Sequence, residues 1–225
     1  MDSLTQIVLG AAVGEAVAGK KIGNKAMAVG AVAGTIPDLD IALRPMQELV
    51  EYLSFHRSFS HSITFALLFS PMFAWIMGKL FPKWEVSFSR WTAFYFLTFL
   101  THSLLDCFTT WGTQLFYPFS DYGVAWYSIF VIDPSYTLPF LLCLIIAAFH
   151  HRTAPGRSFW NYAGIVWSTS YLAFAVWAQH QANQRFEEAW EGQHIEYEDY
   201  ITKPTPFNTL FWSTTAKSDS GFHSG

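Results

Sequence analysis

The amino-acid sequence predicts an all-α fold, a multi-pass membrane helical bundle that ends in a small, incomplete α/β tail. Two observations predict this class. Of the 225 residues, 52% are hydrophobic and only 13% are charged, whereas a typical soluble domain has about 25% charged residues. The apolar residues also form a series of long stretches, and three of these approach the roughly 20 residues that a helix needs to cross a bilayer core.

Six apolar segments follow one another along the chain. The first two are short and rich in Ala, Val and Gly, which suits close packing between helices. The third, fourth and sixth approach spanning length, and the fifth does so only if residues 131–139 contribute. Any one segment alone would also suit a core helix of a soluble protein, so the series as a whole carries the prediction. In order, the segments are 4–19, 26–43, 63–81, 91–110, 138–149 and 159–179.

The basic residues predict an orientation in the bacterial inner membrane. With six spans and the N-terminus outside, most of them fall on the inner side, as the positive-inside rule requires. The tail after residue 179 then lies outside. We therefore expect a transmembrane domain over residues 1–182 and an extramembrane tail, which looks truncated, over residues 183–225. The inner basic residues are Lys20, Lys21, Lys25, Lys79, Lys83, Arg90, Arg152 and Arg157. A net charge of −4 without a basic stripe argues against a nucleic-acid partner.

Nearly every Asp and His of the predicted membrane part falls at the outer end of its segment. Ionisable groups at membrane depth are costly, and by default they mark a functional site that faces a cavity or the bundle interior. The residues concerned are Asp38 and Asp40 in "GTIPDLDIA", His56 and His61 in "FHRSFSHS", His102 and Asp106 in "FLTHSLLDC", and Asp133 in "FVIDPSY".

The pair His102 and Asp106 has the clearest spacing. On a helix the two residues are one turn apart, so their side chains share a face. An imidazole nitrogen and a carboxylate are common ligands of zinc and similar divalent ions. A His–Asp hydrogen bond that holds two helices together explains the pair equally well.

The other two pairs converge only under a structural condition. His56 and His61 can reach one site if a helix begins between them, with Ser58 or Ser60 as its N-cap. Asp38 and Asp40 can converge if Pro37 interrupts the helix; otherwise they are solvated carboxylates.

Together the three pairs have the composition of a hydrolytic site with one or two metal ions, which polarise an ester or phosphoryl oxygen and lower the pKa of water. Arg57 could neutralise a phosphate oxygen there, or pair with one of the nearby carboxylates. The sequence contains no G-x-S-x-G motif, no H-E-x-x-H motif and no Gly-rich phosphate loop, so serine catalysis has no motif to support it.

These motifs in combination resemble a known family. "PDLD", "HRSFSHS" and "THSLLDCFTTWGTQLFYPFSD", with "MDSLTQIVLGAAVGEA" before them and "FVIDPSYTLP" after them, are similar to the YdjM-like family of bacterial inner-membrane proteins over most of residues 1–210. Members of this family are described as membrane-bound metal-dependent hydrolases, with a motif order similar to zinc-dependent phospholipase C and P1-type nucleases. The resemblance implies one or two ions, Zn²⁺ or else Mn²⁺, held by Asp38, Asp40, His56, His61, His102 and Asp106. Many members have His in place of Gln6, and a neutral amide is a poor zinc ligand, so Gln6 is not among the predicted ligands.

Three functional hypotheses follow. The first is a metal-dependent hydrolase that acts on a phosphoester or ester at the outer membrane face, with lipid as a natural substrate and Arg57 or Asp133 assisting in binding or proton transfer. The second is a transporter or a metal or proton conductor that uses the same residues as a pathway. The third is a structural membrane protein whose polar pairs only lock helices together. The placement of the residues on one side speaks against the second hypothesis, and the convergence of three pairs speaks against the third.

Overall fold

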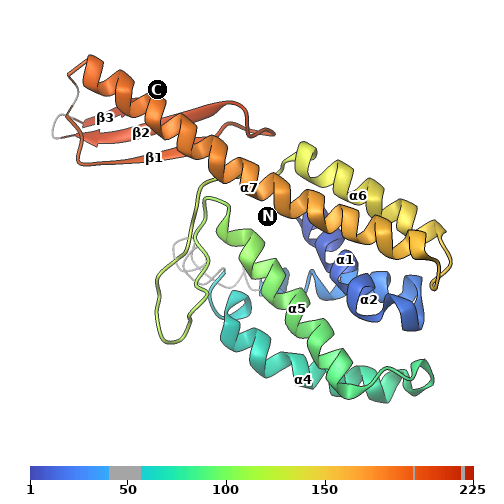
Figure 1. Cartoon of the computed structure of the whole chain (residues 1–225). Helices are drawn as coiled ribbons and strands as arrows, with labels where there is room; N and C mark the ends of the chain where they lie inside the picture. Colours follow the sequence, from blue (N-terminus) through green and yellow to red (C-terminus); the bar gives the residue numbers. More distant parts are fainter. Residues whose placement is uncertain (41–56, 195, 219–220) are drawn as a thin grey trace.

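Three helical hairpins and a small sheet make up the computed structural model, which describes residues 1–40, 57–194, 196–218 and 221–225 (Figure 1). Helix α1 contacts both of the other hairpins, so it lies at the centre of the helical part. The hairpins are α1 (Ser3–Ile22) with α2 (Asn24–Ala33), α4 (Ile63–Leu80) with α5 (Phe88–Cys107), and α6 (Pro134–Phe149) with α7 (Pro155–Gly192); short 3₁₀ helices η2 (Phe59–His61) and η3 (Pro82–Trp84) flank α4.

The predicted all-α, multi-pass membrane bundle is wrong. Of the described residues, 64% are helical, and three strands form an antiparallel sheet. Within the described residues, α4 is the one helix long and apolar enough to cross a membrane, with a mean hydropathy of 1.5 over 18 residues. Helix α6 is apolar but has only 16 residues. Helix α5 has spanning length, but its hydropathy is low because it contains polar side chains such as Thr98, His102 and Asp106. These side chains are buried inside the protein.

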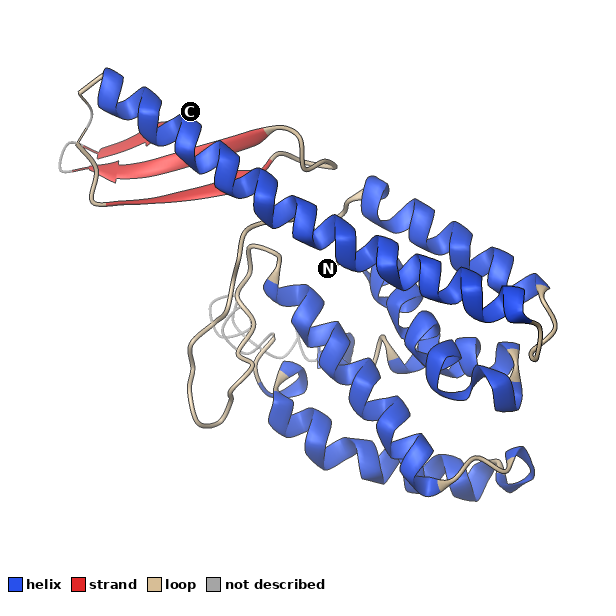
Figure 2. Ribbon diagram, viewed as in Figure 1, coloured by secondary structure: helices blue, strands red, loops and turns tan. Residues whose placement is uncertain are grey.

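The sheet follows the long helix α7, which runs without a break past residue 182 (Figure 2). Strands β1 (Asp199–Pro204), β2 (Trp212–Ser218) and β3 (Gly221–Ser224) pair in that order, with Tyr200 opposite Ala216. Trp190 near the end of α7 is buried against Tyr197 and Tyr200. These aromatic contacts attach the sheet to the last turns of α7.

Helices α1 and α2 cross at very short range because glycines line their contact. A Cβ atom added at Gly30 would lie 2.1 Å from the carbonyl oxygen of Gly10, and one at Gly14 would lie 2.4 Å from that of Ala26. No larger residue fits where two backbones approach so closely. This contact sets the position of the chain that leaves α2 at Gly34.

Two apolar clusters hold the hairpins together on either side of α1. One joins α2, α4 and α5 around aromatic rings, among them Trp91, Phe94 and Phe99. The other joins α1 to α6 and α7 around Tyr136 and Phe140. Helices α4 and α5 are antiparallel neighbours, so the C-terminal end of α5 and the N-terminal end of α4 meet. This meeting point is where His61, His102 and Asp106 lie.

The glycine contact leads to a stability prediction. We expect Gly30→Ala to lower the free energy of unfolding by about 1–3 kcal/mol, because the added methyl group meets a backbone carbonyl that cannot move aside. Gly78→Ala in α4 is the matched control, since nothing lies within 4 Å of its added Cβ. That variant should be as stable as the wild type or gain up to about 1 kcal/mol. Denaturant unfolding followed by circular dichroism compares the two, and equal stability would contradict the packing account.

Candidate metal centre

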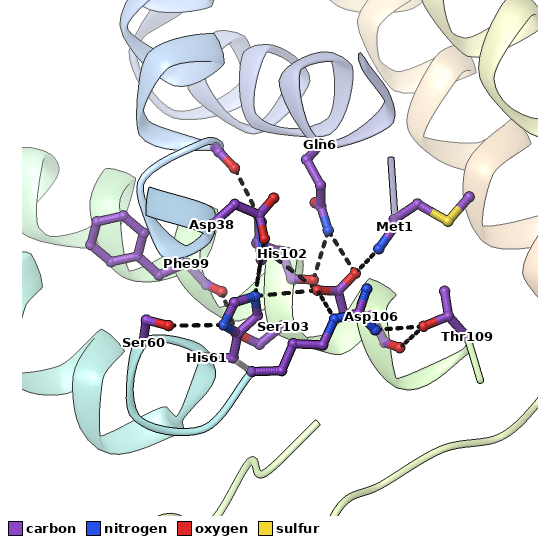
Figure 3. A network of polar contacts seen from close by, with 12 residues as sticks. Met1, Gln6, Asp38, Ser60, His61, Phe99, His102, Ser103, Asp106 and Thr109 are labelled. Atoms are coloured by element: carbon purple, nitrogen blue, oxygen red, sulfur yellow. Dashed lines mark hydrogen bonds and ion pairs between the residues drawn. The ribbon is translucent and has the colours of Figure 1, made fainter. Parts of the chain in front are cut away.

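Four of the predicted side chains meet at one point inside the protein (Figure 3). One ligand atom from each of Asp38, His61, His102 and Asp106 lies within 4.8 Å of all the others. The imidazoles and the Asp106 carboxylate are fully buried, whereas the Asp38 side chain is 26% exposed. The cluster therefore has an aqueous side, and Asp38 lies on it.

Local backbone geometry brings these residues together from three parts of the chain. Helix α2 ends at Ala33, and residues 37–40 form a separate 3₁₀ turn that carries Asp38. Ser62 is the N-cap of α4, and its hydroxyl accepts the amide N–H of Phe65 at 3.0 Å. His61 thus lies just before the helix, and neither Ser58 nor Ser60 is its N-cap. His102 and Asp106 lie one turn apart on α5, as the sequence predicts.

The hydrogen bonds of the two histidines determine which ring nitrogens face the cluster. His102 Nδ1 lies 2.8 Å from the carbonyl oxygen of Gly34. A carbonyl only accepts, so Nδ1 carries the proton and the neutral ring presents the Nε2 lone pair to the cluster. Ser60 Oγ donates to Asp40 Oδ2 at 3.2 Å and lies 3.0 Å from His61 Nδ1. Because its single proton goes to the carboxylate, Ser60 accepts from His61 Nδ1, so the neutral form of the His61 ring presents the lone pair of Nε2 to the cluster.

When both rings are neutral, the atoms that face one another at the centre are all acceptors. The two Nε2 atoms are 3.2 Å apart. His61 Nε2 is 3.3 Å from Asp38 Oδ1 and 3.3 Å from Asp106 Oδ2. Asp106 Oδ2 is buried, and it has no hydrogen-bond partner within the described residues. Such a group of lone pairs is repulsive unless a cation is shared among them, and two imidazoles with two carboxylates are a donor set that suits Zn²⁺.

The charged groups at the cluster also shift one another's pKa values. Burial raises the pKa of Asp106, but the Met1 amino group, His61, His102 and Arg57 outweigh burial and hold this pKa well below its usual range. Burial also raises the pKa of Asp38, but its interactions with His102 and His61 lower this pKa further than burial raises it. Conversely, burial lowers the pKa of His61, but Asp106 and Asp38 raise it above its ordinary value. Both carboxylates thus stay negative and draw positive charge to this point.

Gln6 and the Met1 amino group complete the wall of the site on the α1 side. The Met1 amino group contacts Asp106 Oδ1. Gln6 Nε2 donates to the same oxygen at 3.1 Å and to the His102 carbonyl at 3.3 Å, and Gln6 Oε1 is buried without a hydrogen-bond partner in the described residues. Sequence reasoning left Gln6 out because an amide is a poor zinc ligand. Gln6 is one of three polar side chains in the mostly apolar segment 4–19, with Thr5 and Glu15, and this polarity is the signal for a role beside the ligands.

Arg57 reaches the cluster from a strained backbone position. Its φ angle is +63°, a left-handed conformation that costs a residue with a side chain about 1–3 kcal/mol. The buried guanidinium donates from Nη1 to Thr109 Oγ1 at 2.8 Å, and its Nε lies 3.6 Å from Asp106 Oδ2. Within the described residues this Nε makes no hydrogen bond. A buried, charged donor is thus held beside the ligands.

The other predicted site residues have different positions. Asp40 contacts His61 through Ser60 and is not part of the four-residue cluster. Asp133 caps α6, where its Oδ1 accepts the amide N–H of Ser135 at 3.0 Å and its Oδ2 accepts the Tyr171 hydroxyl at 2.9 Å. His56 lies outside the described residues.

Comparison with known proteins places the chain in a family. The YdjM inner membrane protein family matches residues 1–182. The chain belongs to this family. Membership confirms the family resemblance of the sequence motifs and supports a location at the inner membrane. The similarity to phospholipase C and P1-type nucleases stays a prediction.

Comparison also finds a curated relative. The uncharacterized protein YfhP of Bacillus subtilis (strain 168) is 29% identical over 213 residues, which cover 91% of this chain and 62% of YfhP. The chain thus spans less than two thirds of that relative's length. No solved structure matches the chain.

The cluster leads to a prediction about metal content. We expect His102→Ala and Asp106→Asn to lose bound zinc, because each removes one of the four converging ligand atoms. His151→Ala and Asp121→Asn change the same residue types at exposed positions and should keep the wild-type content. Elemental analysis of the full chain, purified in mild detergent with zinc in the medium, measures ions per chain. Equal metal content in the cluster variants and their controls would exclude these residues as ligands.

Proposed function

We propose that the protein is a metal-dependent hydrolase of phosphoester or ester bonds at the inner membrane. The observation that carries this proposal is the convergence of two imidazole lone pairs and two carboxylates on one buried point, beside the Asp106 oxygen that has no hydrogen-bond partner within the described residues. Asp38, His61, His102 and Asp106 would hold the ion. Zn²⁺ fits this donor set best, and Mn²⁺ is the second choice.

A bound divalent ion would polarise the scissile phosphoryl or carbonyl group and lower the pKa of water. The chain's own residues supply the rest. Arg57 offers a guanidinium whose Nε, 3.6 Å from Asp106 Oδ2, makes no hydrogen bond within the described residues, so it can bind an anionic substrate oxygen. Gln6 Oε1 can accept a hydrogen bond from a hydroxyl group or a water molecule. Both groups lie against Asp106, so a substrate at the cluster can contact them together.

A substrate would approach from the Asp38 side. The Asp38 side chain is 26% exposed, and the other three ligands are at most 1% exposed. Burial of the remaining ligands lowers the local dielectric and strengthens the interaction of Arg57 with a developing negative charge. Exclusion of water also limits the number of groups that compete for the ion.

The basic residues support an orientation with the cluster at the outer side. Helix α4 begins beside the cluster and ends at Leu80, near Lys79, Lys83 and Arg90. The positive-inside rule places this basic end of the candidate span in the cytoplasm. A site at the opposite end would then meet the outer leaflet, where the ester and phosphodiester groups of lipids are available as substrates.

A transport pathway through the same residues receives less support. Glu15 is the one acidic residue of α1 toward the basic end. Arg157 binds both of its carboxylate oxygens at 2.6 Å, and the pair is buried. A carboxylate held in this way is a poor relay for ions or protons. The hydrolase hypothesis needs no such relay.

Arg57 provides the test of hydrolysis. We expect Arg57→Gln to keep its zinc and to lower turnover about 100-fold, because a donor to the reacting oxygen is lost while all four ligands remain. Turnover is measured by phosphate or fatty-acid release from mixed phospholipid micelles, with bis(p-nitrophenyl) phosphate as a soluble substrate. His151→Ala is the control at an exposed position. Zinc-loaded wild type without turnover on any of these substrates would overturn the proposal, as would unchanged turnover in Arg57→Gln.

A further inference from the structure

A polar groove of about 600 Å³ lies at the end of the helical part opposite to the metal cluster. Residues of α1 and residues near the N-terminal ends of α5 and α7 line it. Figure 1 shows where these helices lie in the fold. Arg90 in this groove and Asp106 in the cluster are 16 residues apart on α5, or about 24 Å at 1.5 Å per residue. The groove is therefore separate from the proposed catalytic site, and that function makes no use of it.

Asn161 gives this groove an unsatisfied acceptor. Its side chain lines the groove and is only 2% exposed. The Nδ2 atom donates to the carbonyl oxygen of Ala12 at 3.1 Å, which fixes the orientation of the amide. The Oδ1 atom then remains buried without a hydrogen-bond partner within the described residues. Leaving a buried acceptor unpaired costs about 1–3 kcal/mol, and a ligand that donates a hydrogen bond would remove this cost.

The charge of the groove is positive. Lys20 and Arg90 line it and are exposed, and neither forms an ion pair with any described residue. The carboxylate of Glu15 also lines the groove, but Arg157 neutralises it with two hydrogen bonds. The hydroxyl groups of Ser89 and Ser158 add further donors to the lining. A ligand for this groove needs an anionic group for the cations and a hydroxyl donor for Asn161.

The surroundings of the groove indicate a membrane–water boundary. A second hollow of about 380 Å³ shares Lys20 with the groove and is also lined by Lys21, Lys25, Lys83 and Arg152. The candidate membrane helix α4 ends beside these residues at Leu80. Lys79 and Lys25 lie over the rings of Trp75 and Trp84, at 5.9 and 5.3 Å from the ring centroids. Basic and aromatic residues at the end of an apolar helix are typical of the lipid headgroup level.

We infer that the groove binds the headgroup of an anionic glycerophospholipid, with phosphatidylglycerol as the chemical type. Lys20 and Arg90 bind the phosphate, and a headgroup hydroxyl donates to Asn161 Oδ1. The volume suits a headgroup with its phosphate, since small-molecule sites usually have about 300–1,000 Å³. A bound lipid would bridge α5 and α7 across α1, since residues of all three helices line the groove.

The first experiment measures phosphatidylglycerol binding to the full chain in detergent by native mass spectrometry. The variant K20Q/R90Q removes two exposed charges and leaves the buried core intact. We expect its affinity for phosphatidylglycerol to fall about 30-fold. The control R185Q/K203Q makes the same charge change at exposed positions near and in the sheet and should bind as the wild type does. Equal affinity in the two double variants would overturn the inference.

The second experiment tests the role of Asn161. Phosphatidylmethanol has the same charge as phosphatidylglycerol but no headgroup hydroxyl. We expect the wild type to prefer phosphatidylglycerol about tenfold, and N161L, with folding checked by circular dichroism, to lose this preference. Absence of any preference in the wild type would overturn the assignment of the acceptor. If soluble glycerol phosphate competes as well as the lipid does, the ligand is a free phosphate ester and the lipid assignment is wrong.

Lipid binding in the groove can be tested separately from metal binding and hydrolysis at the cluster. His102 lies at the other end of α5 from the groove. We therefore expect the His102→Ala variant to bind phosphatidylglycerol as the wild type does, even where the substitution changes metal content or turnover. Loss of lipid binding in this variant, with the fold intact, would contradict the separation of the two sites.

Discussion

Two carboxylates and two imidazole Nε2 atoms that face one another form the constraint on which the rest of the site depends. His102 donates to the Gly34 carbonyl and His61 donates to Ser60, so the Nε2 atoms of the two rings point inward, 3.2 Å apart. Without positive charge this arrangement is repulsive. The low pKa values of Asp38 and Asp106 and the raised pKa of His61 are three expressions of that single charge requirement.

The close contact between α1 and α2 positions the groups that hold His102 and Asp106 in place. The glycine crossing lets the two helix backbones touch, and the end of α2 then presents the Gly34 carbonyl to His102 while Gln6 on α1 reaches Asp106. At the far end of α1 the buried Glu15–Arg157 pair attaches the same helix to α7. Helix α1 is thus held at both ends by polar contacts, and it connects the metal cluster to the basic groove.

The sequence predicted the polar pairs better than it predicted the fold. Helical spacing alone places His102 and Asp106 on one face, and interruption of the helix at Pro37 is the condition under which the sequence predicts that Asp38 and Asp40 converge. Of these two carboxylates, Asp38 belongs to the four-residue cluster and Asp40 does not. Local spacing could not reveal that Ser60 stands between Asp40 and His61, or that Asp133 caps α6, because both contacts depend on tertiary structure. The prediction of a multi-pass bundle was wrong because apolar composition does not distinguish a helix buried by its neighbours from a helix that faces lipid. Helix α1, for example, is rich in apolar residues because it packs at the centre of the protein.

X-ray absorption at the zinc edge of the zinc-loaded full chain tests the central claim most directly, since it reports the ligands of the ion itself. If the ion is bound by Asp38, His61, His102 and Asp106, its first shell contains only nitrogen and oxygen atoms, at about 2.0–2.2 Å. The spectrum should also show outer-shell scattering from two imidazole rings. The signal of one ring should disappear in His61→Ala. A sulfur neighbour at about 2.3 Å, or a spectrum without imidazole scattering, would contradict the account.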